Sequence, residues 1–349
     1  MPSNAQQTSR IDSGRILITG GTGSFGSTMA RRLLDTEVEE IRIFSRDEAK
    51  QDSMRRQLPD ERLRFYIGDV RDADSVNRAS RGIDHVFHAA ALKQVPSCEF
   101  FPIEAMRTNV VGSANVIEES NRNGVRSVVC LGTDKAVYPI NAMGMTKALM
   151  EKTVQAFARN NRMSETVVSS VRYGNVMYSR GSVIPLFMEQ LRDGKSLTVT
   201  DPKMTRFLMS LDDAVALVEH AFVSARPGDL FVRKAPASTM GVLAEAVAEL
   251  LGAEPDISVI GTRHGEKLFE VLATREELVR AEDQGDFYRV PVDDRNLNYS
   301  LYFDSGDIAE NETDDYTSHN TERLSTGAVR ELLLTLEPVR RELALAGRD

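Results

Sequence analysis

Short apolar runs alternate with longer helix-like segments along the first half of the chain. Six runs have the length and the β-branched or aromatic content of strands, and they lie at 15–19, 41–45, 63–67, 85–88, 127–131 and 166–172. The segments between them that have the composition of helices lie at 24–35, 72–81, 103–123 and 142–152. Strands that alternate with helices in this way predict an α/β fold with a doubly wound parallel sheet.

The second half of the chain predicts more helices and one long polar segment. Apolar-periodic segments that predict helices lie at 183–191, 211–223, 242–251 and 328–336. The segment 282–321 is acidic and rich in Asp and Asn, which is typical of a solvated loop. We find no internal repeat and no low-complexity linker.

Composition restricts the class of protein. The chain has 349 residues, of which 41% are hydrophobic and 27% charged, as expected for a globular protein of one large or two coupled domains. No apolar run approaches the roughly 20 residues that a bilayer span needs, and the polar N-terminus lacks a signal core. The net charge of −9 argues against general nucleic-acid binding. Cys98 and Cys130 have no metal-type spacing, so we expect no metal and a reduced, cytoplasmic protein.

A glycine-rich turn joins the first predicted strand to the first predicted helix. A tight turn of this kind lets the backbone approach a pyrophosphate, which the free N–H groups and positive dipole of the helix N-terminus then bind. A turn without a ligand is the alternative, and the strand–turn–helix context argues against it. The residues expected at the cofactor here are Gly20, Thr22, Gly23, Ser24, Phe25 and Gly26.

The end of the second predicted strand indicates which dinucleotide binds. Arg46 follows Gly26 by 20 residues, where an acidic residue would bind the ribose 2′-hydroxyl of NAD and an arginine accommodates the 2′-phosphate of NADP. Ser45 and Lys50 flank it, so we predict NADP, although Asp47 points the other way. The alternative is a salt-bridged start of a surface helix.

Small and polar residues follow the third and fourth predicted strands. Asp69 and Val70 are placed to meet the adenine, and the small side chains of Ala89, Ala90 and Ala91 would let a cofactor lie against the backbone. We expect Lys93, the first charge beyond them, at the substrate, and Asn109 at the cofactor. We interpret His88 as a hydrogen-bonded structural histidine rather than a base.

The fifth predicted strand leads into the residues that could carry chemistry. Thr133, Asp134 and Lys135 follow its carboxyl end, where open α/β sheets place their active sites. Met143 and Lys147 are four residues apart on the next helix and share one face. A solvated loop and a surface helix are the alternative, since most Lys and Asp side chains are exposed.

Long motifs of this chain resemble one family. They are GGTGSFG (20–26), HAAALKQVP (88–96), TDKAVYPIN (133–141), RYGNVMYSRGSVIPLF (172–187), TDPKMTRF (200–207), GEKLFE (265–270), DFYRVPVDDRNLNY (286–299) and YTSHNTERL (316–324). The chain resembles, from Arg15 to about Leu334, the UDP-N-acetylglucosamine 4,6-dehydratases that invert C5 within the extended short-chain dehydrogenase/reductase superfamily. Its similarity is greatest to the capsule and O-antigen enzymes on the path to UDP-N-acetyl-L-fucosamine.

The resemblance implies a domain organisation. We expect a disordered tail at 1–14, an NADP-binding Rossmann domain at 15–173 that elements up to about 225 complete, a mainly substrate-binding lobe at 174–336, and a tail at 337–349. It also implies a homo-oligomer, as a hexamer, with the helices 103–123 and 142–160 at a subunit contact.

The same resemblance implies a reaction with internal redox chemistry. Oxidation of C4 by NADP makes the C5 proton acidic, the C6 hydroxyl then leaves, and the hydride returns to C6. The product would be UDP-2-acetamido-2,6-dideoxy-beta-L-arabino-hexos-4-ulose. Our hypothesis makes Lys135 the base at C5 and Asp134 the acid at C6, with Thr133 at the C4 oxygen. Lys147 would hold the nicotinamide ribose and assist, through a water molecule, at the C4 hydroxyl.

One departure from the superfamily concerns Met143, which stands where a tyrosine usually precedes the lysine by four residues. A thioether cannot transfer a proton. The resemblance to the capsule subgroup includes this Met, so the departure is interpreted as a property of that subgroup. It leaves the base for the first oxidation unassigned. Tyr138 is a conceivable substitute, but its place beside Pro139 favours a packing role.

Further residues are expected at the UDP-sugar. Asn175 suits a phosphate or uracil contact, and the planar guanidinium groups of Arg206 and Arg263 suit a diphosphate, although a single arginine could equally be a surface residue. The other expected substrate contacts are Val183, Tyr316 and Asn320.

Two other function classes stay open. A UDP-sugar 4-epimerase shares the fold and substrate, but it usually keeps the tyrosine and does not need the pair Asp134 and Lys135. A non-catalytic NADP-binding protein would explain the loss of the tyrosine, but not the intact pair.

Overall fold

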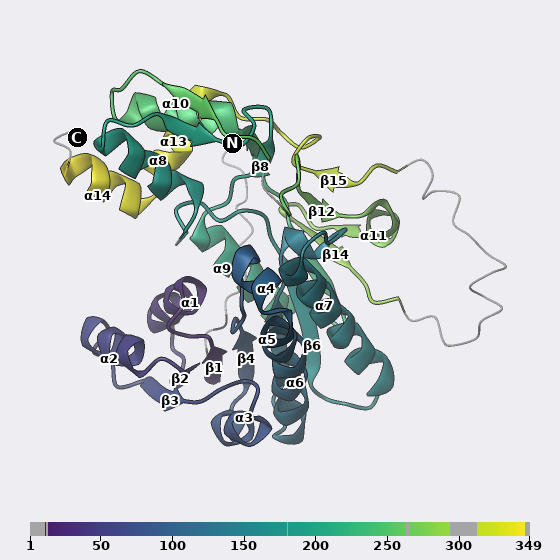
Figure 1. Cartoon of the computed structure of the whole chain (residues 1–349). Helices are drawn as coiled ribbons and strands as arrows, with labels where there is room; N and C mark the ends of the chain where they lie inside the picture. Colours follow the sequence, from purple (N-terminus) through teal and green to yellow (C-terminus); the bar gives the residue numbers. More distant parts are fainter. Residues whose placement is uncertain (1–10, 12, 180, 263–264, 294–312, 346–349) are drawn as a thin grey trace, which may run out of the picture.

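A large, mostly parallel β-sheet forms the centre of the molecule (Figure 1). The computed structural model describes residues 11, 13–179, 181–262, 265–293 and 313–345. The sheet has the strand order β13-β14-β9-β6-β5-β4-β1-β2-β3. Its strands are β1 (Arg15–Thr19), β2 (Glu40–Ser45), β3 (Leu63–Ile67), β4 (His85–His88), β5 (Ser127–Leu131), β6 (Val167–Arg172), β9 (Leu230–Arg233), β13 (Glu282–Asp283) and β14 (Phe287–Val290).

All pairings from β3 to β9 are parallel, and the order reverses direction between β1 and β4. This is the order of a Rossmann fold, and it places the main ligand crevice at the carboxyl ends of β1 and β4. The predicted fold class is therefore confirmed.

Helices cover both faces of the sheet because its strands are apolar on both sides. Ile16 and Ile18 face one core with Met29 of α1, while Leu17 between them faces the other core with Val116 of α6. The helices on the first face include α1 (Ser24–Leu34), α2 (Glu48–Gln57) and α9 (Leu211–Ser224), and those on the second include α3 (Ala73–Ser80), α6 (Gly112–Arg122) and α7 (Ala142–Asn160).

The helix predicted at 103–123 is interrupted. Its parts are α5 (Pro102–Met106), a π-helical turn at Arg107–Val111, and α6. Such a turn inserts one extra residue into a helix and is frequent at functional sites. Just before it, the sequence analysis missed the short helix α4 (Val95–Phe100).

A second, smaller lobe packs around its own core, at the upper left of Figure 1. Its elements are α8 (Val183–Arg192), α10 (Met240–Leu250), α13 (Thr326–Leu334), α14 (Glu337–Leu345), β7 (Leu197–Val199) and β11 (Ile257–Val259). The segment expected as a tail at 337–349 is therefore a helix up to Leu345, because Val339 and Leu343 are buried in this core. At the other end of the chain, Ile11 is buried in the first core, although the segment 1–14 was expected as a tail.

The acidic segment 282–321 is not simply a loop. Strand β14 pairs antiparallel with β9 and β13 pairs antiparallel with β14, which extends the main sheet, and Phe287 and Val290 are buried. Farther on, β15 (Tyr316–Thr317) pairs with β12 (Val271–Ala273). These strands have only two to four residues, which is too short for a periodic pattern among so many Asp and Asn residues, so the sequence did not predict them. Residues 294–312 lie outside the described part of the chain.

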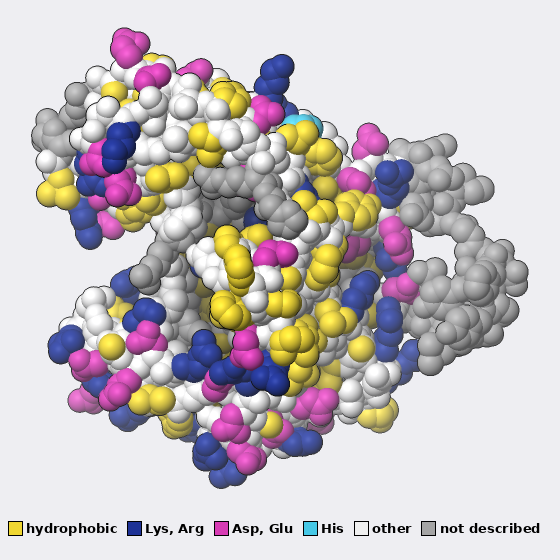
Figure 2. Space-filling view, in the orientation of Figure 1, with side chains coloured by type: hydrophobic (Ala, Val, Ile, Leu, Met, Phe, Trp, Pro, Cys, Tyr) yellow, Lys and Arg dark blue, Asp and Glu magenta, His cyan; other side chains and the backbone are white. Residues whose placement is uncertain are grey.

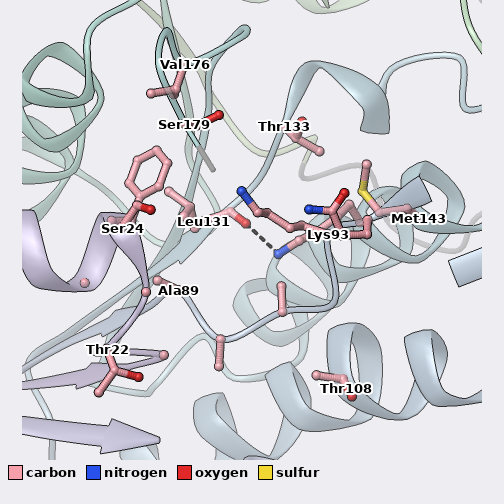
Figure 3. Close-up of a pocket in the computed structure, with 18 of the residues that line it drawn as sticks. Thr22, Ser24, Ala89, Lys93, Thr108, Leu131, Thr133, Met143, Val176 and Ser179 are labelled. Atoms are coloured by element: carbon pink, nitrogen blue, oxygen red, sulfur yellow. Dashed lines mark hydrogen bonds between the residues drawn. The ribbon is translucent and has the colours of Figure 1, made fainter. Parts of the chain in front are cut away.

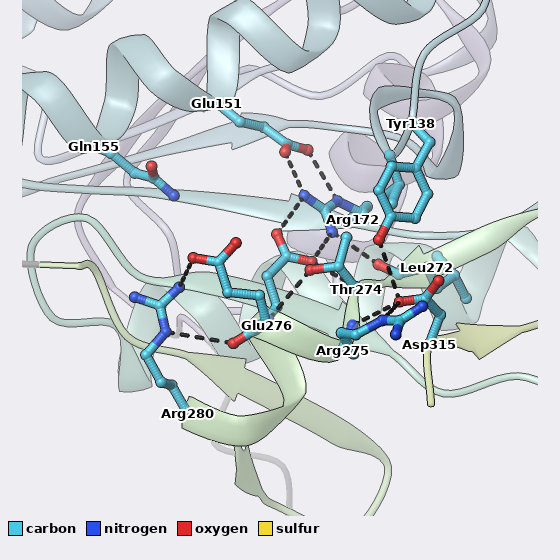
Figure 4. A network of polar contacts seen from close by, with 12 residues as sticks. Tyr138, Glu151, Gln155, Arg172, Leu272, Thr274, Arg275, Glu276, Arg280 and Asp315 are labelled. Atoms are coloured by element: carbon cyan, nitrogen blue, oxygen red, sulfur yellow. Dashed lines mark hydrogen bonds and ion pairs between the residues drawn. The ribbon is translucent and has the colours of Figure 1, made fainter. Parts of the chain in front are cut away.

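A buried ion-pair network joins these C-terminal strands to the Rossmann domain (Figure 4). Arg172 at the end of β6 donates two hydrogen bonds to Glu151 of α7, at 2.6 and 3.2 Å. It also donates to Glu277 of α11 (Arg275–Arg280) and to the Leu272 carbonyl of β12. The network fixes α7 and β12 on opposite sides of one guanidinium group.

Candidate active site

A cavity of about 1050 Å³ opens at the carboxyl ends of β1, β4, β5 and β6. Figure 3 shows that Ser24, Leu131, Lys93 and Met143 come from different elements and surround the same space. The expected cofactor residues that line it are Gly20, Thr22, Gly23, Ser24, Phe25, Gly26, Ser45, Arg46, Lys50, Asp69, Val70, Ala89, Ala90, Ala91, Met143 and Lys147. The expected catalytic or substrate residues that line it are Lys93, Thr133, Asp134, Lys135 and Asn175.

The glycine turn has the geometry that a pyrophosphate requires. Gly20 has a φ of +67°, which favours glycine, and a Cβ on Gly26 would collide with the backbone of Gly21. Helix α1 begins at Ser24, and its N-cap Gly23 provides no side chain to bind the first N–H groups. These donors and the positive end of the helix dipole lie at the cavity, so a dinucleotide phosphate fits here.

The part of the cavity beside the ends of β2 and β3 carries paired charges. Asp47 caps α2 and accepts hydrogen bonds from the backbone and side chain of Lys50, at 3.0 and 2.5 Å. Arg46 is 55% exposed, and its guanidinium lies 3.6 Å from Asp69. Although burial opposes the effect, Arg71 lowers the pKa of Asp69 by hydrogen bonding to it. The carboxylate of Asp47 is thus occupied by Lys50, and Arg46 is a second, more than half-exposed cation at this part of the cavity.

Asn109 does not line the cavity, contrary to expectation. The side chain is fully buried in the π-helical turn, where it accepts from the Leu92 N–H and donates to the Leu92 carbonyl and to Thr146. It therefore fixes the backbone after Ala91. Its neighbour Thr108 lines the cavity, and its buried hydroxyl has no partner in the described chain.

His88 has the structural role predicted for it. The ring bridges Thr19 and Ser113 at 2.7 and 2.8 Å and is fully buried. Burial lowers the pKa of His88 to about 3, with a further contribution from the nearby Lys147 cation. It is therefore neutral near pH 7 and joins β1, β4 and α6.

Lys147 is buried beside the end of β5. Its ammonium donates to the Leu131 carbonyl at 2.7 Å (Figure 3), and burial lowers the pKa of Lys147 to about 8. Met143, one turn earlier on α7, is 4% exposed and lines the cavity. Tyr138 does not replace the missing tyrosine, because it is 52% exposed and bonds Asp315 at 3.3 Å, outside the cavity.

Thr133, Asp134 and Lys135 form one hydrogen-bonded group. Asp134 Oδ1 accepts from Thr133 Oγ1 at 2.8 Å and from Lys135 Nζ at 3.0 Å. The other oxygen, Oδ2, is buried without a protein partner among the described residues. Burial alone would lower the pKa of Lys135, but the carboxylates of Asp134 and Glu270 outweigh it and raise that pKa. Lys135 is therefore held as an ammonium, whereas the role of base at C5 requires a neutral amine.

Glu270 is a residue of this group that the sequence analysis missed. Its Oε1 lies 3.8 Å from Lys135 Nζ and 3.7 Å from Arg206 Nε. The only sequence signal was its place at the end of GEKLFE, which carries no information about contact with a residue 135 positions earlier.

Several expected substrate residues do not reach the cavity. Arg206 donates to the Thr205 carbonyl and faces Glu270, so its guanidinium is not presented as a diphosphate clamp. Tyr316 bonds Ala235 and Thr321, and Asn320 bonds Thr317 and Asp315, so both are used in local structure. Val183 begins α8 and packs against the second core. Arg263 lies outside the described residues.

Polar residues that the sequence analysis did not assign also line the cavity, among them Gln94, Thr108, Tyr173, Ser179 and Ser182.

Among the described residues no group of three or more His, Cys, Asp or Glu side chains could hold a metal ion. Within the same part of the chain, no helix combines the length and the apolar character of a membrane span.

This fold defines a protein of the Rossmann class, and its glycine turn suits a dinucleotide phosphate. The chain belongs to the polysaccharide biosynthesis protein family, whose model matches residues 16–292, and a second model, for the C-terminal part of such proteins, matches residues 293–340. It is 56% identical over 332 residues to proteins from Rickettsia canadensis and Rickettsia prowazekii, each named UDP-glucose 4-epimerase, covering 94% of this chain and 97% of each relative.

Solved structures of extended short-chain dehydrogenases/reductases have the same fold. The X-ray structure of Pen from Bacillus thuringiensis superposes with a TM-score of 0.83 at 35% identity, covering 93% of this chain and 98% of Pen. DesIV of Streptomyces venezuelae, a dTDP-glucose 4,6-dehydratase with NAD and TYD bound, gives 0.66 at 26% identity over 73% and 86% of the two chains. A nicotinamide cofactor is therefore typical of this class.

Proposed function

We propose that the chain is an NADP-dependent UDP-N-acetylglucosamine 4,6-dehydratase that inverts C5 and serves the synthesis of a capsule or O-antigen sugar. The observation that carries this proposal is the hydrogen-bonded pair Asp134 and Lys135 at the cavity, in a site that has Met143 in place of tyrosine. Sugar-nucleotide names among relatives and neighbouring structures support the substrate class.

The overall reaction removes water from the sugar. A bound nicotinamide would accept a hydride from C4 and return it to C6. The C4 hydroxyl and C5 each lose a proton, the C6 hydroxyl leaves, and C5 regains a proton on the opposite face. The net loss is one water molecule, and the protein has to supply a base and an acid close together.

Asp134 and Lys135 can become such a base and acid together. In the resting state Lys135 is an ammonium that donates to Asp134 at 3.0 Å. Transfer of this proton to Asp134 gives a neutral amine for the C5 proton and a carboxylic acid for the C6 hydroxyl. This retains Lys135 as base and Asp134 as acid, with no proton taken from the solvent. Thr133 donates to the same carboxylate and orients it.

Lys147 suits the first oxidation. Its ammonium lies at the carbonyl of Leu131, and the lowered pKa of about 8 makes it easier to deprotonate than an ordinary lysine. It would hold the nicotinamide ribose and accept, through a water molecule, the proton of the C4 hydroxyl.

The second candidate is a UDP-sugar 4-epimerase, which the names of the Rickettsia relatives favour. An epimerase removes and returns a hydride at C4 and breaks no bond at C5 or C6. It therefore has no use for a second proton-transfer pair beside the one group that serves the C4 hydroxyl.

Proton NMR of the purified protein in D₂O with UDP-N-acetylglucosamine, and separately with UDP-glucose, distinguishes the two. A new C6 methyl signal with deuterium at C5 and no net NADPH is the expected result. Formation of UDP-N-acetylgalactosamine or UDP-galactose without a methyl signal would establish the epimerase instead.

Arg46 should determine the preference for NADP. Arg46→Ala removes the cation that would meet the 2′-phosphate, so we expect the Kd for NADP to rise about tenfold or more while the Kd for NAD changes little. Titration of the two cofactors into cofactor-free protein measures both constants. Arg64→Ala, at an exposed position of β3, is the matched control. Equal losses for both cofactors would contradict the assignment.

We also propose that the chain forms a homo-oligomer, as a hexamer, through its exposed apolar face. Phe100, Phe101 and Ile103 are more than half exposed, and so are Met145 and Leu149 one turn apart on α7. Figure 2 shows hydrophobic side chains gathered over α4, α5 and α7.

Met145→Asp should shift the sedimentation coefficient toward a smaller species, and a wild-type protein that sediments as one chain would contradict the proposal.

A further inference from the structure

Glu270 is a buried carboxylate whose surroundings are mostly cationic. Its side chain is 4% exposed, and it follows Lys267 by three residues in the motif GEKLFE. The charged groups that face it are Lys135, Asp134, Arg206 and Lys267. It does not line the cavity, so it acts on a ligand only through one of these neighbours.

The C-terminal segment fixes the backbone of Glu270. The Glu270 N–H donates to Ser318 Oγ at 2.9 Å, and the Ser318 N–H donates to the Glu270 carbonyl at 2.9 Å. Ser318 Oγ lies 2.8 Å from Thr205 Oγ1, on the strand that also carries Arg206. Ser318 is fully buried and follows β15. Its hydroxyl therefore connects the segment after β15 with β8 (Thr205–Phe207) and with the residue before β12.

One oxygen of Glu270 points to a role beyond packing. Oε2 is buried and has no hydrogen-bond partner among the described residues, while Oε1 has only two ion-pair contacts longer than 3.5 Å. A buried carboxylate with so few hydrogen bonds costs stability, and an apolar side chain of similar volume would avoid this cost. The position therefore favours a residue kept for its charge.

We propose that Glu270, held in place by Ser318, is a positioning residue that keeps Lys135 aligned with Asp134 and controls how readily Lys135 gives up its proton. This deepens the proposed dehydratase and rests on it for the role of the pair. It also makes the C-terminal segment, although distant in sequence, part of the proton-transfer machinery.

The negative charge of Glu270 determines the sign of its effect on the pKa of Lys135. Glu270 and Asp134 both raise the pKa of Lys135. Burial raises the pKa of Glu270 itself, and the nearby Lys135 opposes that rise. Glu270→Gln preserves the shape of the side chain and removes its charge, so Lys135 should become easier to deprotonate. An opposite charge within about 4–6 Å is typically responsible for one to three pKa units.

Competitive labelling tests this without any turnover. Full-length protein is treated with trace acetic anhydride between pH 8 and 10, and mass spectrometry gives the labelling rate of Lys135 relative to the exposed Lys152. Since a fall of one pKa unit multiplies the fraction of free amine by ten, the ratio in Glu270→Gln should rise about tenfold. Glu249→Gln, which breaks an exposed pair with Arg330, is the matched control and should leave the ratio unchanged.

A second variant keeps the test decisive if Glu270→Gln does not fold. Ser318→Ala leaves the charge but removes the hydroxyl that accepts from the Glu270 N–H, so the ratio should rise by a smaller factor. An unchanged ratio in folded Glu270→Gln, or in Ser318→Ala where only that variant folds, would overturn the proposal. Failure of the dehydratase would appear separately, as the absence of a methyl product from the wild-type protein.

Discussion

Replacing Lys135 with methionine should reduce product formation by about 10²–10⁴-fold, as is typical when a general acid or base is removed. The reason is specific to the pair: without the Lys135 amine, no group hydrogen-bonded to Asp134 can take the C5 proton while Asp134 serves the C6 hydroxyl. Deuterium incorporation at C5, followed by NMR in D₂O, should fall by the same factor. Cofactor binding should persist, because the cofactor contacts at the glycine turn and Arg46 are unchanged.

The matched control is Lys152→Met, which removes an exposed lysine from the same helix as Lys147. It should retain wild-type rates. Normal deuterium exchange at C5 in Lys135→Met would remove Lys135 as the base, and Lys147 would become the strongest candidate because its pKa is lowered to about 8.

The sequence predicted the cofactor half of the cavity well because its signals are local. A strand, a glycine turn and a helix occupy consecutive positions from Arg15 to Leu34, and each can be interpreted without knowing the rest of the chain. The same holds for Asp134 and Lys135, which follow directly after a fully buried strand. The parallel sheet then brings these strand ends together at one edge.

The sequence did not predict the ion pairs of Glu270 with Lys135 and Arg206, because these residues are far apart in the chain. Glu270 meets Lys135 only because β12 packs against the turn at Asp134–Ala136, and strands of two or three residues leave no periodic signal. Arg206 was expected at a diphosphate for its guanidinium group and its place in the motif TDPKMTRF, whereas the fold turns it toward Glu270. Local patterns cannot give the direction of a side chain on a short strand.

The protonation of Lys135 illustrates the same limit in electrostatic terms. Burial by itself favours the neutral form of a lysine, and it does lower the pKa of Lys135. The outcome depends on two carboxylates, however, and one of them comes from a segment that sequence reasoning did not place nearby. The sign of the shift therefore required the tertiary structure.

Arg172→Met should lower the free energy of unfolding by about 3–5 kcal/mol, the usual cost of removing one partner from a buried ion pair. Arg172 is 4% exposed, and its loss removes the ion-pair partner of both Glu151, which is 6% exposed, and Glu277, which is 19% exposed. Although burial opposes the effect, Arg172 lowers the pKa of Glu277 and so stabilises the charged form of that carboxylate. Denaturant unfolding of the variant and the wild type measures the difference.

Two further variants separate the charge of the network from its packing. Arg330→Met breaks an exposed pair in which both side chains are 47% exposed, and it should cost about 1 kcal/mol or less. Adding Glu151→Gln and Glu277→Gln to Arg172→Met removes the unpaired charges and should recover part of the loss, since neutral replacements of a buried ion triad are often tolerated. If the triple variant were no more stable than Arg172→Met, the network would act through its hydrogen bonds to Leu272 and the packing of β12 against α7, and not through its charges.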